Sequence, residues 1–185
     1  MIDIEKYKII LIGSGLASYS VCKSLANFKI PILILESGKE SFDEKYSILS
    51  EHNEIGDLKK NYYKNHSTRM IGGASNVWAG HASLPTIYDI EKISDLPPFP
   101  IDYLEIKKYY QKVLRQFYNL NLDEYNSFNS FISKNDDFNF RPHFYNTQKV
   151  ISLEDFNQFN NVKVYTETTL LKIYSDYRKK INKIK

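Results

Sequence analysis

The residues with the clearest chemical potential lie near the N-terminus. An apolar run, YKIILI over residues 7–12, is followed by GSGLAS over residues 13–18, and a second apolar run over residues 30–35 ends at Glu36. Glycines in a turn between a strand and a helix allow a ligand to approach the backbone closely. The free N–H groups at the start of a helix, together with its dipole, attract phosphate. The pattern therefore predicts a site for the pyrophosphate of a dinucleotide.

The acid at the end of the second run completes this pattern. Glu36 follows the first glycine by roughly 20 residues, where a carboxylate can accept hydrogen bonds from both ribose hydroxyls and repels a 2′-phosphate, which disfavours NADP. Ser18 replaces the third glycine of G-x-G-x-x-G, so we expect a slight shift in helix–strand packing. The residues predicted to contact the cofactor in this unit are Gly13, Ser14, Gly15, Leu16, Ala17, Glu36 and Ser37.

These residues must be positioned by a β-strand, a helix and a second, parallel strand. Short apolar runs enriched in β-branched residues, at 7–12 and 30–35, are typical of strands buried on both faces. Ala17, Val21 and Leu25 recur at helical spacing between them. The fold class expected is α/β, with a Rossmann-like dinucleotide-binding unit. The alternative is an ordinary α/β turn without a ligand, and the unit alone does not separate NAD from FAD.

A second glycine-rich stretch, RMIGGASNVWAG over residues 69–80, holds three of the 7 glycines and the single Trp. Consecutive glycines before small residues form a loop whose backbone can lie against a flat ligand. A plain turn followed by a buried Trp78 is the alternative. The candidate ligand contacts in this loop are Arg69, Gly72, Gly73, Ser75 and Asn76.

Three segments together resemble the glucose–methanol–choline (GMC) family of FAD-dependent oxidoreductases. They are the N-terminal unit ending in LESG at 35–38, the stretch RMIGGASNVWAG, and FPIDYLEIKKYY at 99–110, with Phe99 where the family has Trp. The resemblance implies that the Gly-Gly loop lies along the flavin and pyrophosphate of FAD. Some relatives attach FAD through a histidine just before the Trp. Val77 occupies that position, so the resemblance implies non-covalent FAD.

The resemblance also implies a reaction, the transfer of hydride from a CH–OH group of an alcohol or sugar to flavin N5. The base in such enzymes is a histidine far along the C-terminal half, and no catalytic residue is assigned in this sequence. We expect the N-terminal, FAD-binding portion of a longer oxidoreductase, whose C-terminal half is supplied separately. The alternatives are a truncated flavin-binding module without turnover and an NAD-dependent dehydrogenase. The four histidines, scattered and without metal-ligand spacing, are His52, His66, His81 and His143.

The pattern of the whole sequence predicts three parts. Residues 1–84 hold the FAD-binding unit and flavin loop, 85–150 a linker, helix and irregular substrate-side segment, and 151–185 the strands that return to the FAD-binding domain. Residues 39–68 show no clean period and resemble an insertion. Asp102 can cap a helix whose apolar stripe is Ile106, Tyr110, Val113 and Phe117, backed by Leu114. Alternation at 162–166 predicts a strand, and 170–174 indicates another.

Bulk composition limits the classes of partner. The 185 residues carry a net charge of +3, and the basic run at 178–185 is typical of a solvated tail rather than a nucleic-acid site. Cys22 is the single cysteine and is expected in the core, and no metal site is expected. No apolar run reaches the ~20 residues that span a bilayer. We expect a cytoplasmic protein that exposes a sheet edge and apolar faces when it stands alone.

Overall fold

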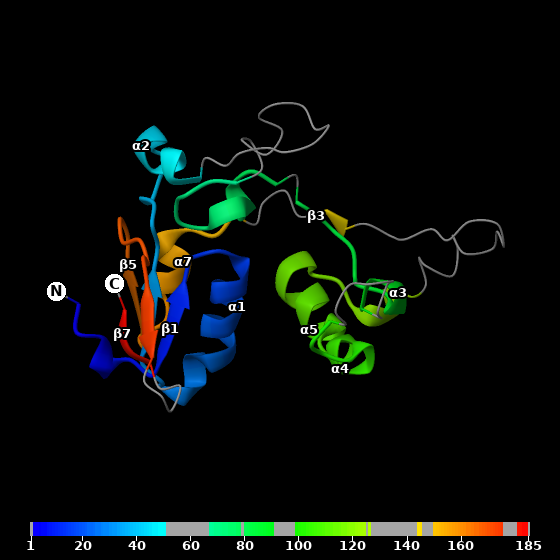
Figure 1. Cartoon of the computed structure of the whole chain (residues 1–185). Coiled ribbons are helices and arrows are strands. Elements are labelled where there is room, and N and C mark those ends of the chain that lie inside the picture. The colour runs from blue at the N-terminus through cyan, green and yellow to red at the C-terminus, as the bar shows by residue number, and fades with distance from the viewer. Residues whose placement is uncertain are drawn as a thin grey trace. The chain divides into compact units, whose positions relative to one another are not determined.

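The chain forms two compact units. A computed structural model describes residues 2–50, 67–78, 80–90, 99–124, 126, 144–145, 150–175 and 181–184. The first unit comprises residues 1–78 and 150–185, and the second comprises residues 79–149 (Figure 1). The chain therefore leaves the first unit after Trp78, just beyond the Gly-Gly loop, and returns to it at Val150.

A small parallel sheet forms the centre of the first unit. Its strands are β1 (Ile9–Ile12), β2 (Ile32–Leu35) and β5 (Val162–Tyr165), in the order β1-β2-β5. Both pairings are parallel and in continuous register. All four residues of β2 are buried, as a central parallel strand requires. The α/β class is confirmed, as is the return of the strand at 162–166 to the side of the second strand.

Two helices pack together on this sheet. Helix α1 (Leu16–Leu25) connects β1 to β2, and α7 (Leu153–Asn157) precedes β5 (Figure 1). The Tyr19 ring meets Phe156 edge to face, with centroids 6.0 Å apart. The stripe predicted from residues 17, 21 and 25 is not the buried face, because α1 buries Ser18, Tyr19 and Cys22 instead. The periodicity of the apolar residues predicted the helix correctly. The buried face, however, lies about one residue further along the chain than the predicted stripe.

Cys22 provides a probe of this packing. Its thiol is fully buried, and burial raises its pKa to about 11. Because thiolate is the reactive form, we expect Cys22 to react with a thiol reagent at least about a hundredfold more slowly in the native protein than in denaturant. A timed colorimetric titration at constant pH measures this ratio, and Cys22→Ala gives the blank. Rapid reaction of the native protein would contradict the buried position.

The other elements of the first unit surround the sheet. Helix α2 (Glu44–Ser47) continues into a 3₁₀ turn at Ile48–Ser50. Strands β6 (Ile173–Ser175) and β7 (Ile181–Ile184) form an antiparallel pair. Within the basic run, residues 181–184 form a strand in which Lys183 pairs with Tyr174, while Arg178, Lys179, Lys180 and Lys185 lie outside the described residues. Short 3₁₀ helices also occur at Ile4–Lys6 and Ala26–Phe28.

The second unit has its own apolar cluster of Leu84, Tyr110 and Leu114. The helix predicted from Asp102 is divided into α4 (Tyr103–Lys107), α5 (Tyr110–Val113) and a π-helical turn, Leu114–Tyr118. Asp102 caps α4, as predicted, by accepting from the Leu104 N–H at 2.7 Å. The interruption and the π turn rotate the faces, so Val113 is 37% exposed and Leu114 takes the core position. The unit also contains α3 (Ile87–Ile90), and β3 (His81–Ala82) paired with β4 (Phe144–Tyr145).

None of the helices in the described part of the chain has the length and apolarity that crossing a bilayer requires.

Candidate functional site

The glycine turn after β1 leads directly into α1. Gly13 has φ +87°, and its N–H donates to the Leu35 carbonyl at 2.8 Å, which ties the turn to the end of β2. Gly15 is the N-cap of α1, and no side chain caps the helix. The backbone N–H groups of Leu16 and Ala17 thus open the helix with no side-chain acceptor. A helix that begins this way offers its first N–H groups and its dipole to an anion.

Ser18, in place of the third glycine, has an internal role. Its side chain is 8% exposed, and its hydroxyl donates to the Gly13 carbonyl at 2.6 Å. The hydroxyl therefore braces the turn against the first turn of α1. This bond explains how a serine fits where the motif usually has a residue without a side chain.

Glu36 lies just past the end of β2 and is 4% exposed. Its Oε2 accepts from the Ser14 N–H at 3.0 Å and from the Ser14 hydroxyl at 2.7 Å. Its Oε1 accepts from the Gly38 N–H at 2.8 Å. Oε1 also accepts from the Ser37 hydroxyl at 3.4 Å. Each oxygen of an ionised carboxylate has two lone pairs, so all four have a donor within the protein, and the Ser37 bond is the longest of them.

The tertiary structure brings the second glycine stretch against the first. Gly15 and Gly72 form an isolated parallel bridge, and Lys39 and Met70 form another. The Gly72 N–H donates to the Ser14 hydroxyl at 3.2 Å, although the two residues are 58 positions apart. The stretches that the sequence singled out separately therefore form one continuous surface of backbone at the carboxyl ends of β1 and β2.

Ser75 and Asn76 shape the loop from within. The Gly-Gly loop continues as a 3₁₀ helix, Gly73–Asn76. The Ser75 hydroxyl donates to the Gly72 carbonyl at 2.8 Å, and the Asn76 Nδ2 donates to the Ile71 and Gly73 carbonyls at 2.8 and 2.9 Å. These side chains hold the loop conformation, and the surface that the loop offers is largely backbone.

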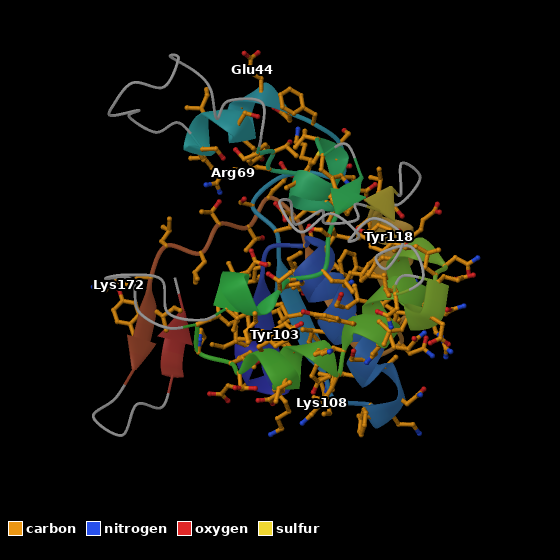
Figure 2. The ribbon with its side chains drawn as sticks, turned by 90° about the vertical axis from the view of Figure 1, so that its right-hand side faces the viewer. Glu44, Arg69, Tyr103, Lys108, Tyr118 and Lys172 are labelled. Carbon is orange, nitrogen blue, oxygen red and sulfur yellow. The ribbon has the colours of Figure 1, made fainter. Side chains whose placement is uncertain are left out.

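Arg69 acts as a brace between segments. Its Nη1 donates to the Ser37 hydroxyl at 2.9 Å, its Nε to Ser50 Oγ at 2.7 Å, and its Nη2 to the Leu49 carbonyl at 2.8 Å. Figure 2 shows Arg69 beside the segment that contains α2. The predicted contacts Arg69 and Ser37 are thus brought together, and they join the end of β2 to the start of the Gly-Gly loop.

The glycines differ in what requires them. Gly13, Gly72 and Gly73 have positive φ, at +87°, +85° and +53°. A Cβ at Gly38 would overlap the backbone carbonyl of Arg69 and lie 2.6 Å from Met70 N. Gly15 has neither reason, because its φ is −75° and its Cβ would meet only the Gly72 carbonyl oxygen, at 3.9 Å. The missing side chain at Gly15 therefore leaves space that none of the described residues fills.

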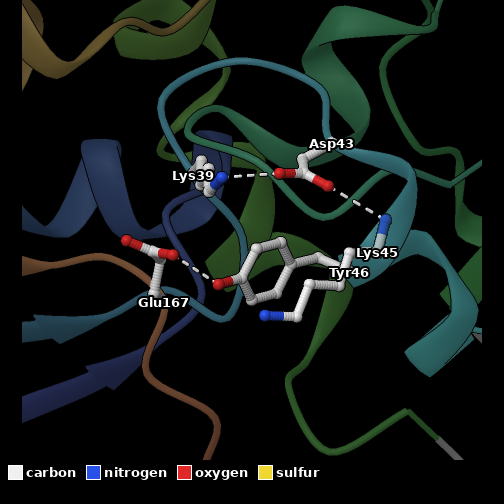
Figure 3. Close-up of polar contacts among 5 residues, drawn as sticks. All are labelled: Lys39, Asp43, Lys45, Tyr46 and Glu167. Carbon is white, nitrogen blue, oxygen red and sulfur yellow. Dashed lines mark hydrogen bonds and ion pairs between the residues drawn. The ribbon is translucent and has the colours of Figure 1, made fainter.

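A polar cluster joins α2 to the segment after β5 (Figure 3). The Tyr46 hydroxyl donates to Glu167, and Lys39 bonds to Asp43 at 2.6 Å. The ammonium groups of Lys39 and Lys45 lie 5.7 and 5.6 Å from the centroid of the Tyr46 ring. The ion pair lowers the pKa of Asp43 through its hydrogen bond to Lys39. The cluster therefore connects α2 to the segment after β5. Lys39, one of its members, directly follows Gly38, whose backbone packs against that of Arg69.

The Tyr46–Glu167 contact should appear in a pH titration. The hydrogen bond to Glu167, followed by burial, raises the pKa of Tyr46. A raised phenol pKa means that the contact contributes stability below the unfolded pKa of about 10 and loses it as pH rises through the folded value. We expect Glu167→Ala to lower the Tyr46 pKa. Tyrosinate absorbance is followed against pH in the wild type and in Glu167→Ala. The curve of the same protein carrying Tyr46→Phe is subtracted from each, which leaves the titration of Tyr46 alone. If the two difference curves superimpose, the contact between Tyr46 and Glu167 is contradicted.

Among the four histidines, only His81 belongs to the described part of the chain. His52, His66 and His143 lie outside the described residues, and His81 starts β3 in the second unit. Val77 is 43% exposed directly after the loop. Within the described ranges, no group of three or more His, Cys, Asp or Glu residues could hold a metal ion. Neither a protein-family model nor a curated protein matches this chain, so the site is defined by its geometry alone.

Proposed function

We propose that the first unit binds FAD non-covalently, with the dinucleotide lying over the glycine turn and along the Gly-Gly loop. The bridge between Gly15 and Gly72 supports this, because it makes one backbone surface from two stretches distant in sequence. The position of that surface, at the carboxyl ends of parallel strands, is where open α/β sheets bind ligands. The unit would then be a Rossmann-type FAD-binding domain.

The observation that carries the proposal is the space at Gly15. Neither the backbone conformation nor packing against the described residues demands a glycine there. A pyrophosphate bound to the first N–H groups of α1 would demand it, since a Cβ would stand between the phosphates and the backbone. The residues present thus fit a dinucleotide.

Each part of the site would hold a different part of the cofactor. The N–H groups of Gly15, Leu16 and Ala17 would bind the pyrophosphate. Glu36 Oε1 would accept a ribose hydroxyl in place of the Ser37 hydroxyl, whose bond at 3.4 Å is the longest that the carboxylate makes. Gly72 and Gly73 would present flat backbone to the flavin side, on a loop whose shape Ser75 and Asn76 maintain. When bound, FAD supplies a hydride acceptor for the oxidation of a CH–OH group in an alcohol or sugar.

The proposed enzyme is an FAD-dependent oxidoreductase of the GMC type in the cytoplasm. No described residue of the site is assigned as the base that removes the hydroxyl proton. We propose that a separate C-terminal half supplies this base and most of the substrate pocket. The first unit would contribute cofactor binding and orientation.

The test is direct. Purified protein, alone and with any downstream partner, is incubated with FAD, desalted and scanned for flavin absorbance in the visible range. We expect bound flavin that is released by acid precipitation, because Val77 offers no nucleophile for attachment. A colourless protein after incubation would reject FAD binding, and colour retained in the acid pellet would reject the non-covalent assignment.

A second candidate is a flavin-binding module without turnover. The internal hydrogen bonds of Ser75 and Asn76 favour it, because the loop offers backbone and shape rather than reactive side chains. A downstream coding segment with a His–His or His–Asn pair separates the two, since only the enzyme needs it. A parallel titration with NAD tests the dehydrogenase alternative; tight NAD binding without FAD binding would favour that alternative.

A further inference from the structure

The middle residue of the first glycine motif, Ser14, has an unusual environment for a ligand contact. It is 0% exposed, so its side chain has no surface open to a bound molecule. Its hydroxyl nevertheless makes two hydrogen bonds, donating to Glu36 Oε2 at 2.7 Å and accepting from the Gly72 N–H at 3.2 Å. A serine hydroxyl has one proton to donate, and that proton is committed to the carboxylate. The role of Ser14 is therefore internal.

These bonds belong to a continuous buried chain. From Gly72 it runs onward, because the Ser75 hydroxyl donates to the Gly72 carbonyl at 2.8 Å and accepts from the Ile151 N–H at 3.3 Å. Glu36 and Ser75 are each 4% exposed. Polar groups bonded in series in a medium of low dielectric polarise and fix one another. The carboxylate at the end of β2 is thus linked through Ser14 to the loop, and through Ser75 to the returning chain.

We propose that Ser14 is a positioning residue that couples the adenosine side of the cofactor site, at Glu36, to the flavin side, at Gly72. This inference rests on the proposed FAD binding. The hydroxyl groups of a bound ribose would hold the Glu36 carboxylate in position. The carboxylate would in turn fix the Ser14 hydroxyl, and the oxygen of that hydroxyl is the acceptor for the Gly72 N–H. Binding of the adenosine half therefore orders the loop that receives the flavin half.

The consequence is a difference between a whole and a partial ligand. Without the hydroxyl, Glu36 still accepts from the N–H groups of Ser14 and Gly38 at 3.0 and 2.8 Å, so the adenosine side persists. The buried Gly72 N–H, by contrast, loses its acceptor. AMP, which reaches only the adenosine side, and FAD, which reaches both, should respond differently to Ser14→Ala.

The experiment compares dissociation constants for FAD and AMP in the full chain. For Ser14→Ala we expect FAD binding to weaken about tenfold, the value of one buried hydrogen bond, and AMP binding by less than about threefold. Ser14→Thr, which keeps a hydroxyl, should restore FAD affinity to within about threefold. The control is Ser20→Ala, which removes a serine hydroxyl from α1. That hydroxyl donates to the Leu16 carbonyl at 2.9 Å. FAD and AMP should bind Ser20→Ala with the same affinities as they bind the wild type.

A measurement on the unmodified protein keeps the test independent of whether the variants fold. Hydrogen exchange at the Gly72 amide should slow about fivefold or more when AMP alone saturates the protein. The coupling is overturned if AMP leaves the exchange rate of the Gly72 amide unchanged. It is also overturned if Ser14→Ala binds FAD as tightly as Ser20→Ala does. Equal losses of FAD and AMP also overturn it, because Ser14 would then act on Glu36 alone. Failure of the wild type to bind FAD rejects the proposed function itself, and the coupling with it.

Discussion

Gly15→Ala is expected to weaken FAD binding by about 10- to 100-fold while leaving the fold intact, which corresponds to about 1.4–2.8 kcal/mol of binding free energy. The added methyl group would occupy the space where the pyrophosphate meets the first N–H groups of α1. Inside the protein it would meet only the Gly72 carbonyl oxygen, at 3.9 Å, an ordinary contact. The φ of −75° is one that alanine adopts without strain.

The unfolding free energy of this variant should change by less than about 1 kcal/mol, because the lower entropy of the unfolded chain offsets a slightly poorer N-cap. Isothermal titration with FAD and thermal melting of the ligand-free protein measure the two quantities. An alanine variant that binds FAD with wild-type affinity would remove the main support for a dinucleotide at this turn. A variant that loses stability would show that Gly15 is required by the fold.

Gly38→Ala should show the opposite behaviour. A Cβ at Gly38 would overlap the Arg69 carbonyl, and the neighbouring atom is again backbone, Met70 N at 2.6 Å. Backbone cannot rotate away as a side chain can, so the crossing of the two segments must open. The bridge between Lys39 and Met70 and the bond from the Ile71 N–H to the Lys39 carbonyl at 2.9 Å lie beside this crossing.

We expect a loss of about 3 kcal/mol or more of unfolding free energy, which lowers Tm by roughly 10 °C for a chain of this size. Chemical denaturation with matched thermal melts provides the measurement, and Gly15→Ala is the matched control because it adds the same methyl group where the protein has room. Wild-type stability of Gly38→Ala would show that the segments do not approach as closely as the structure has them.

Local sequence signals predicted the elements that support the site. Apolar runs identified β1 and β2, alternation at 162–166 identified β5, and the glycine turn placed the start of α1 correctly. Such signals are local, because a buried parallel strand and a helix start each impose their pattern on neighbouring residues. Periodicity was less successful for helix faces. It assigned the wrong face of α1. It also placed Val113 in the core, because it assumed one continuous helix where the structure has a break between α4 and α5.

The candidate site was predictable as a set of residues and not as an arrangement. Gly72 and Ser75 were identified by their unusual composition, but the sequence cannot distinguish a glycine that meets a ligand from one that meets backbone. Gly38 was read as part of a family motif, whereas its packing against Arg69 depends on a contact between distant segments. The two hydrogen bonds of the Ser14 hydroxyl likewise required the fold.

By itself, the sequence determined the strand–turn–helix–strand unit, the acid at its end and the presence of a second glycine stretch, because each depends on residues close together in the chain. Only the tertiary structure decided that the second stretch lies on the first, which glycines are required by packing, and that Glu36, Ser14 and Gly72 are linked. The physical reason is that backbone hydrogen bonds and close contacts between distant segments leave no periodic signal in the sequence.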